Sequence, residues 1–217
     1  AIGVRALYSN TTGNNNVAMG DSAAYFSTVS GLVAIGSKAL YANTTGTNNV
    51  AIGDSAMFAT TTGSRNTAVG SRAYTKSALG TENTAVGYNS MYAATTASYN
   101  TAFGASSLES ITTGTNNVAM GGYSLASNTT GIFNTGIGYQ ALTNNTAGNN
   151  NTGVGLNALN GNTTGNGNTA LGIGAGFSNT TGAENVAIGR FSLFDNQTGG
   201  DNVAIGDEAL MNNTSGS

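Results

Sequence analysis

Large and small residues alternate in a five-residue motif that recurs along the whole chain. Its commonest form reads N-V-A-I-G, as in residues 49–53. Val or Thr lies three places before the glycine, Ala or Gly two places before it, and an apolar residue directly before it. Successive side chains of a β-strand point to opposite faces, so this alternation has the period of a strand. The pattern predicts a strand of about four residues in each copy.

The motif glycines are 17 residues apart, except for one interval of 16 residues between Gly20 and Gly36. They are Gly3, Gly20, Gly36, Gly53, Gly70, Gly87, Gly104, Gly121, Gly138, Gly155, Gly172, Gly189 and Gly206. A repeat this short cannot bury a core alone, but stacked copies align each apolar position into a column. We therefore predict an all-β fold, a parallel β-solenoid or β-roll of thirteen turns that spans residues 1–217 as a single repeat array. At a strand spacing of about 4.8 Å, thirteen turns would form a rod on the order of 60 Å long.

The second half of each repeat carries another apolar group. Ala or Ser lies three places after the motif glycine, and Leu usually follows it, as in Ala39 and Leu40. This group fits a second short strand, or a single helical turn capped by Asp21, Asp54 or Asp207 in their repeats. Both alternatives stay open. The N-T-T-G that follows predicts a turn, because Asn bonds to nearby backbone groups and Gly accepts positive φ.

Asparagine precedes the predicted strand in nearly every repeat. These residues are Asn16, Asn49, Asn66, Asn83, Asn100, Asn117, Asn134, Asn151, Asn168, Asn185 and Asn202. Stacked amides can hydrogen-bond to one another, so we predict a structural Asn ladder. Leu32 is the exception, and it belongs to the repeat that is one residue short. We expect a local kink or an insertion-tolerant corner there.

Composition narrows the chemistry that the chain can perform. It has no His or Cys, and we expect no enzyme, because catalysis needs a positioned nucleophile, acid or base. Asp21, Asp54 and Asp207 belong to separate repeats and are interpreted as corner residues, because a calcium site needs about six oxygens together. We expect no metal or cofactor. With six Lys and Arg in all, the sequence favours neither nucleic acid nor direct membrane insertion by this segment.

Three local motifs resemble functional signatures but are explained by the repeat. Gly172, Gly174 and Gly176 echo a dinucleotide-binding loop, yet they align with an ordinary repeat and lack the required βαβ context. Lys38 follows Ser37 instead of directly following a glycine, as a phosphate loop requires. Glycosylation-type N-T-T sequons occur at Asn10, Asn43, Asn128, Asn162 and Asn179, where the turn explains their spacing.

The repeated N-N-V-A-I-G, N-N-V-A-M-G and E-N-V-A-I-G segments resemble the N-S-V-A-I-G motif of YadA-like trimeric autotransporter heads. They are also similar to repeat arrays of phage tail fibres. The resemblance covers the whole chain and implies a left-handed β-roll in which three chains pack side by side. It also implies an extracellular location, on a cell surface or a virion tail. The repeat here is longer, since L-x-x-N-T-T-G extends its second half.

Aromatic residues five places after the motif glycine form a further column. Its members are Tyr8, Tyr25, Tyr41, Phe58, Tyr92, Phe177 and Phe194. Burial between identical chains would cover such a stripe, so we expect a homotrimer, end-to-end assembly, or both. Aromatic residues outside this column are the candidates for contact with a host or cell-surface glycan or protein. They are Tyr88, Tyr99, Tyr123, Tyr139, Phe133 and Phe191.

Uniform repeats favour length and stiffness over a unique site. The sequence therefore predicts a structural or adhesive segment of a bacterial surface or phage-tail-type fibre, which would act as a rigid stalk or head and belong to a longer fibre. Paired threonines such as Thr44 and Thr45 raise an alternative, an ice-binding solenoid. A fibre-borne glycan depolymerase has the least support, because the sequence offers no paired carboxylates across a cleft.

Overall fold

The structure is a computed structural model that describes residues 1–216. Within them the chain forms twelve short strands and no helix. The strands are β1 (Val17–Met19), β2 (Val33–Ile35), β3 (Val50–Ile52), β4 (Thr67–Val69), β5 (Thr84–Val86), β6 (Thr101–Phe103), β7 (Val118–Met120), β8 (Thr135–Ile137), β9 (Thr152–Val154), β10 (Thr169–Leu171), β11 (Val186–Ile188) and β12 (Val203–Ile205). The chain divides into two compact units, unit 1 (Ala1–Thr113) with β1 to β6 and unit 2 (Gly114–Ser217) with β7 to β12.

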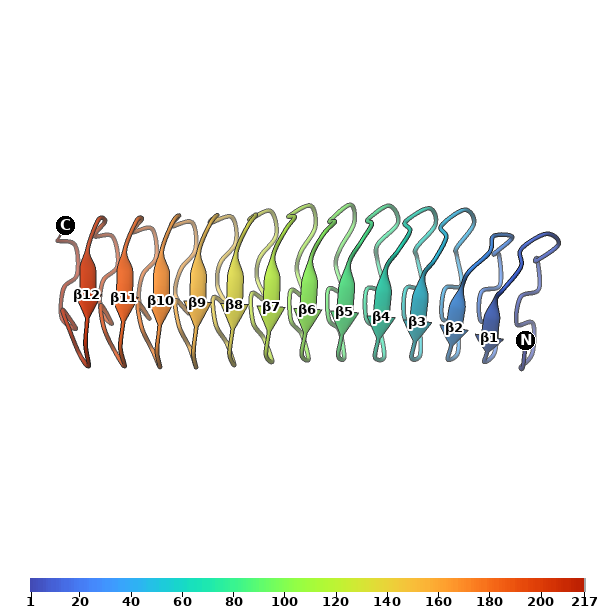
Figure 1. Ribbon diagram of the computed structural model, residues 1–217, viewed down its shortest axis with the longest axis horizontal. Coiled ribbons are helices and arrows are strands. Elements are labelled where there is room, and N and C mark those ends of the chain that lie inside the picture. The colour runs from blue at the N-terminus through green and yellow to red at the C-terminus, as the bar shows by residue number, and fades with distance from the viewer. Residues whose placement is uncertain (217) are drawn as a thin grey trace. The chain divides into compact units, whose positions relative to one another are not determined.

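Consecutive strands pair in parallel within each unit (Figure 1). The register aligns identical places of the repeat, so that Ala51 pairs with both Ala34 and Ala68. One turn of chain therefore separates neighbouring strands, which is the arrangement of a β-solenoid. The predicted all-β parallel solenoid is confirmed. Each strand is three residues long, slightly shorter than the sequence pattern suggested.

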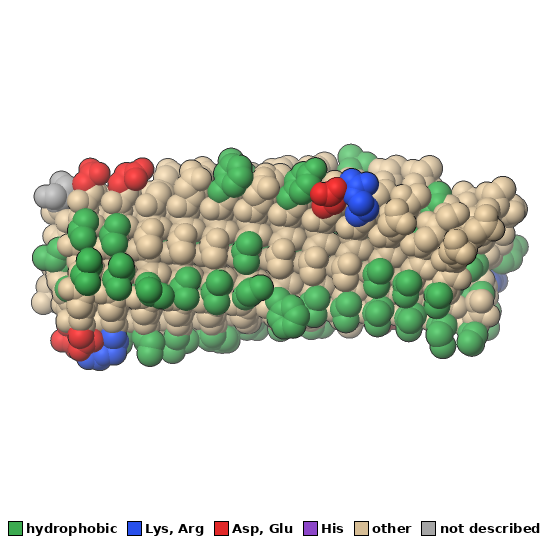
Figure 2. All heavy atoms as spheres, viewed as in Figure 1, with side chains coloured by type: hydrophobic (Ala, Val, Ile, Leu, Met, Phe, Trp, Pro, Cys, Tyr) green, Lys and Arg blue, Asp and Glu red, His purple; other side chains and the backbone are tan. Residues whose placement is uncertain are grey.

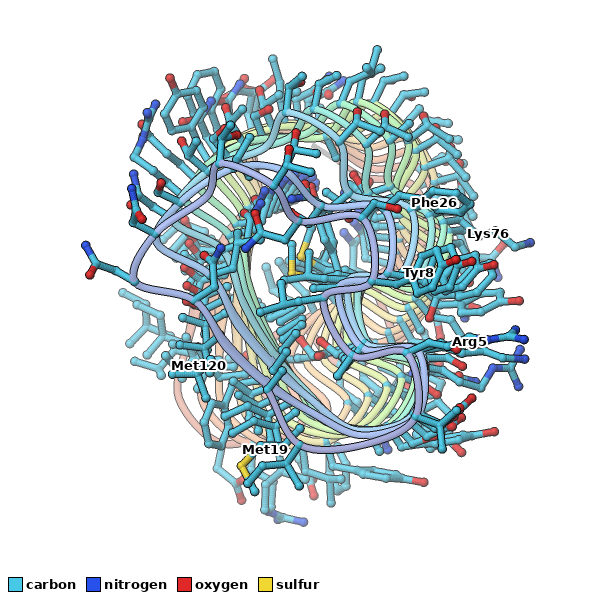
Figure 3. All side chains as sticks on the ribbon, turned by 90° about the vertical axis from the view of Figure 1, so that its right-hand side faces the viewer. Arg5, Tyr8, Met19, Phe26, Lys76 and Met120 are labelled. Atoms are coloured by element: carbon cyan, nitrogen blue, oxygen red, sulfur yellow. The ribbon has the colours of Figure 1, made fainter. Side chains whose placement is uncertain are left out.

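The chain winds in a left-handed sense in both units. In Figure 1 the strands of each unit run downward on the near side, and within each unit successive strands follow one another from right to left. The return path lies on the far side. Figure 3 shows the same winding from the N-terminal end, where unit 1 turns anticlockwise away from the viewer, through Arg5 and then Tyr8. This handedness agrees with the prediction from the resemblance.

Each strand turns its small central residue inward. Ala51 is fully buried, whereas its neighbour Ile52 keeps 36% of its surface exposed on the outer face. The second inward column comes from the fourth place after the glycine, where Leu40, Met57 and Leu125 are buried. The Ala or Ser at the third place after the glycine is buried as well. A parallel sheet brings equivalent residues close together, so small and medium side chains from these three places fill the narrow interior together with the buried asparagines.

The segment after the motif glycine is neither a strand nor a helix. Its second and fourth residues adopt left-handed backbone conformations, for example φ 55° at Lys38 and φ 52° at Leu40. These conformations direct the backbone amides of the two residues to opposite sides of the turn. The Lys38 amide donates to Asp21 O of the preceding turn at 2.8 Å, and the Leu40 amide donates to Ala56 O of the following turn at 3.0 Å. Interturn hydrogen bonds thus compensate a backbone geometry that costs about 1 kcal/mol or more per residue.

The short repeat between Gly20 and Gly36 does not shift the sheet. Val17 still pairs with Val33. The missing residue is absorbed in the corner before Gly31, which takes the left-handed conformation at φ 77° that Asn48 adopts in the next turn. Leu32 is buried at the place of the Asn ladder.

Tyr74 replaces the usual Leu or Met in the inner column of unit 1. Its side chain is 1% exposed, and its hydroxyl accepts a hydrogen bond from Asn83 Nδ2 at 2.7 Å. Burial raises the pKa of the Tyr74 phenol to about 12 from an ordinary value of 10.0. Ionisation is therefore easier in the unfolded chain than in the folded one.

We expect this phenol to make stability depend on pH in alkaline solution. Because the folded-state pKa is raised, its stabilising effect is complete below pH 10 and is lost as pH rises toward 12. A shift of this size corresponds to about 2 to 3 kcal/mol. The free energy of unfolding of the natural chain, minus that of Tyr74→Phe, should fall by this amount in urea titrations over that pH range. A constant difference would contradict the assignment.

Candidate functional surfaces

The asparagines before the strands form buried amide ladders. In unit 2 the Asn151 backbone N–H and side-chain Nδ2 both donate to Asn134 Oδ1, at 3.0 and 3.2 Å. Asn151 Oδ1 in turn accepts from the N–H and Nδ2 of Asn168, at 3.0 and 3.2 Å. Asn151 Nδ2 also donates to Gly165 O at 2.8 Å. Each side chain therefore joins three consecutive turns.

The same ladder runs through part of unit 1 and is interrupted at Leu32. Asn66 and Asn83 repeat the pattern, with the Asn66 N–H donating to Asn49 Oδ1 at 2.9 Å. Asn16 lies on the other side of the interruption. Its Oδ1 accepts from the Leu32 backbone N–H at 2.9 Å, and its Nδ2 donates to Val29 O at 2.7 Å.

A second amide ladder lies in the N-T-T-G turns of unit 2, where the sequence suggested a turn role alone. Asn162 Nδ2 donates to Asn145 Oδ1 at 2.8 Å, and Asn179 Nδ2 donates to Asn162 Oδ1 at 2.9 Å. Four of the five sequon asparagines are buried with hydrogen-bonded Nδ2 atoms, so this fold offers them no room for a glycan. They are Asn43, Asn128, Asn162 and Asn179.

Threonine hydroxyls in the same turns bond to the backbone. Thr44 Oγ1 donates to Thr61 O at 3.1 Å in unit 1, and Thr163 Oγ1 donates to Thr180 O at 2.9 Å in unit 2. The first hydroxyl of each pair is therefore engaged with the following turn. This bonding lends no support to a free hydroxyl array of the kind that the ice-binding alternative invokes.

The outer face of the strands carries two rows of side chains in each unit. One row mixes the Val and Thr residues that open the strands, and the other consists of the apolar residue directly before each motif glycine. Figure 2 shows hydrophobic side chains following the strands on this face. Met19 in unit 1 and Met120 in unit 2 point away from the interior, with 40% and 42% of their surfaces exposed (Figure 3). Apolar rows of this kind mark interaction surfaces.

The aromatic column of unit 1 stacks on itself. Ring centroids are 5.0 Å apart between Tyr8 and Tyr25, 5.3 Å between Tyr25 and Tyr41, and 5.2 Å between Tyr41 and Phe58. Phe177 and Phe194 stack in the same way in unit 2, at 4.9 Å. Stacking covers the ring faces, so outer edges and phenol hydroxyls are what such a column presents to solvent.

The six predicted ligand-contact aromatics do not form one site. They occupy three different places of the repeat, the first, second and twelfth after the motif glycine, and are distributed over both units. Five are exposed by 45% to 55%, and Phe191 is half-buried against Phe194 with the ring centroids 5.2 Å apart. The six are Tyr88, Tyr99, Tyr123, Tyr139, Phe133 and Phe191. Their role in ligand contact stays a prediction.

Charged residues are unevenly divided between the units. Unit 1 holds five of the six Lys and Arg and four of the nine Asp and Glu, so its formal net charge is +1 and that of unit 2 is −4. Exposed ion pairs join Arg65 to Glu82 in unit 1 and Arg190 to Asp207 in unit 2. Asp21 and Asp54 lie exposed on the corner directly after the strands.

The glycines that imitate a dinucleotide loop have a structural explanation. Gly174 and Gly176 adopt φ 62° and 61°, at the two places where other turns hold left-handed non-glycine residues. Lys38 is exposed at the first of these places in its own turn. These residues therefore follow the general geometry of the repeat.

Residues 1–216 contain no pocket and no group of three or more His, Cys, Asp or Glu that could hold a metal ion. Among the same residues there is no helix long and apolar enough to cross a membrane. Comparisons with protein-family models, with curated proteins and with solved structures found no match to this chain.

Proposed function

We propose that this chain is a structural segment of a bacterial surface or phage-tail-type fibre, where it acts as a rigid stalk or head for attachment. The observation that carries this proposal is the bonding between turns. Backbone hydrogen bonds link neighbouring turns within each unit, and in unit 2 the buried amides of Asn134, Asn151 and Asn168 repeat the same links from turn to turn. Such repetition resists bending and local opening, because each turn is held on both sides.

The proposal places the chain outside the cell and gives it no catalytic role. It also includes self-association as a homotrimer. The apolar outer rows of the strands support this step, since burial between identical chains about a rotation axis would cover them. Ile52 and Ile137 are partly exposed in these rows, at 36% and 37%.

Oligomeric mass and resistance to unfolding test this proposal together. Light scattering at micromolar concentration should give three times the chain mass of 21.5 kDa, and the particle should resist heat and protease. Ile52→Asp with Ile137→Asp should convert it to monomer, because these charges would lie in the buried interface. Thr45→Asp, on an exposed turn, is the matched control and should leave the mass unchanged. A monodisperse monomer formed by the natural chain would refute the trimer, and rapid proteolysis would refute the stalk.

A further inference from the structure

Unit 1 carries a row of cations on one side of its turns. Arg5, Lys38 and Arg72 all occupy the second place after a motif glycine, and they belong to alternate turns. Their φ values are 57°, 55° and 59°, so the backbone directs the three side chains alike. Lys76 adds a fourth cation on the same side. Figure 3 shows Arg5 and Lys76 projecting from the side that also carries Tyr8.

Interturn hydrogen bonds fix the spacing of this row. The Lys38 amide donates to Asp21 O at 2.8 Å, and the Arg72 amide donates to Asp54 O at 2.9 Å. Because neighbouring turns are separated by about 4.8 Å, successive cations of the row are about 10 Å apart along the unit. The intervening turns carry Ser22 and Ser55 at the same place.

The stacked aromatic column runs beside the cations. Tyr41 is three residues after Lys38, and its backbone N–H donates to Lys38 O at 3.3 Å. The stack of Tyr8, Tyr25 and Tyr41 therefore presents a row of phenol groups, one per turn, next to one cation on every second turn. Further along, the Arg72 guanidinium and the Lys76 ammonium lie 4.6 and 4.7 Å from the centroid of the Tyr92 ring.

No ion pair within residues 1–113 neutralises these four cations, since the pair found there joins Arg65 to Glu82. The carboxylates of Asp21 and Asp54 are exposed on the same corner, and Glu109 occupies the place of the aromatic column one turn beyond Tyr92. None of the three reaches ion-pair distance of these cations. The four cations therefore keep their positive charge within residues 1–113, and Arg72 and Lys76 also contact the Tyr92 ring.

We propose that this cationic row, with the phenols beside it, binds an acidic polysaccharide that carries one carboxylate or sulfate on every second sugar. An extended pyranose residue is about as long as the spacing between turns. Successive anionic groups would then meet Arg5, Lys38 and Arg72, and sugar hydroxyls would meet Tyr8, Tyr25 and Tyr41. The inference rests on the proposed role in attachment and gives that role a ligand class.

Charge density favours a polysaccharide over nucleic acid. Duplex DNA carries one negative charge per about 1.7 Å, and its affinity comes from many clustered Lys and Arg contacts. The row supplies one cation per about 10 Å. Unit 2, with a formal net charge of −4, does not extend the positive surface.

Binding of the full chain to hyaluronan, which has one carboxylate per disaccharide, tests the proposal. Neutral dextran and single-stranded DNA are the comparison polymers. The triple variant Arg5→Gln, Lys38→Gln and Arg72→Gln removes the three cations at the shared place and keeps Lys76. Glutamine fits this place, because Gln140 occupies it in unit 2 with φ 56°. Arg65→Gln with Arg190→Gln is the matched control, since it removes cations elsewhere, and Asp21→Asn with Asp54→Asn removes the opposing charges.

At low ionic strength the natural chain should bind hyaluronan and not dextran, and added salt should weaken binding. The triple variant should lose about tenfold in affinity, as expected for three exposed charge pairs. The control should stay within about twofold, and the Asp variant should bind more tightly. No binding, unchanged binding by the triple variant, or tighter binding of DNA would overturn the inference. A protease-resistant trimer that ignores hyaluronan would overturn this inference alone and leave the structural role intact.

Discussion

Gly189→Ala is expected to destabilise unit 2 by more than about 4 kcal/mol, a loss typical of severe steric defects. Gly189 has φ 130°, and a Cβ atom there would overlap the carbonyl group of Gly206 in the next turn. Two effects therefore combine. The backbone conformation itself costs about 1 to 3 kcal/mol for a residue with a side chain. The collision adds to it, because the strands cannot separate without losing their hydrogen bonds.

Gly206→Ala separates these two effects. Gly206 has nearly the same conformation, with φ 127°, but the nearest atom to its Cβ position is Ala209 Cβ at 4.0 Å. We expect this variant to lose about 1 to 3 kcal/mol, from backbone strain alone. Urea unfolding, with hydrogen exchange of β11 and β12 to localise the effect, measures both. Equal losses in the two variants would show that the glycine is needed for its conformation and not for the close approach of turns.

Asn151→Ala is expected to cost about 2 to 3 kcal/mol, the second large effect. The substitution leaves the buried Asn168 N–H without its acceptor, and it removes one of two donors to Gly165 O, which keeps a hydrogen bond from Asn162 Nδ2 at 3.1 Å. Each buried group left without a partner costs about 1 to 3 kcal/mol. Thermal or urea unfolding of the variant measures the loss.

Asn144→Ala is the matched control for this ladder. Asn144 Nδ2 also bonds to an asparagine of the next turn, Asn160, at 3.3 Å, but this pair is exposed to water. Water replaces an exposed partner, so the expected change is within about 0.5 kcal/mol. If both variants lost the same amount of stability, burial of the ladder would not be the source of its strength.

The sequence was sufficient to predict the solenoid because the repeat has a strict period. Alternation around Ala51 predicted the strand, and the column of Asn66 and Asn83 predicted the ladder position. Which strand side chains face the interior was harder to predict. The pattern did not show whether Ala51 or its neighbours Val50 and Ile52 face inward, since either face could have held the core. The structure places the alanine inside, where a medium side chain such as Leu40 fills the remaining space.

The corner after the glycine could not be predicted from residue type. Lys38 and Leu40 adopt left-handed conformations that ordinarily require Gly or Asn, and they do so because interturn hydrogen bonds compensate the cost. Gly174 and Gly176 were the residues whose type indicated the left-handed conformation at these two places, but they resembled a ligand-binding loop. The second amide ladder was missed for a related reason, because Asn145 and Asn162 also satisfy the rules for an ordinary turn.

The cationic row of unit 1 was also missed, although Arg5, Lys38 and Arg72 share one place in the repeat. The total of six Lys and Arg is low, and it does not show that three of them are aligned. The stacked turns bring three residues that are distant in sequence onto one surface. To predict this surface, the register between turns must be known, and the structure supplies it.

Cryo-electron microscopy of the purified chain tests the central claim most directly. The claim is that near-identical turns, joined by backbone bonds and amide ladders, stack into a segment that associates with itself. It predicts particles of three chains in which each unit shows layers spaced by about 4.8 Å, one for each strand. Particles of a single chain, or density without layers at this spacing, would contradict it.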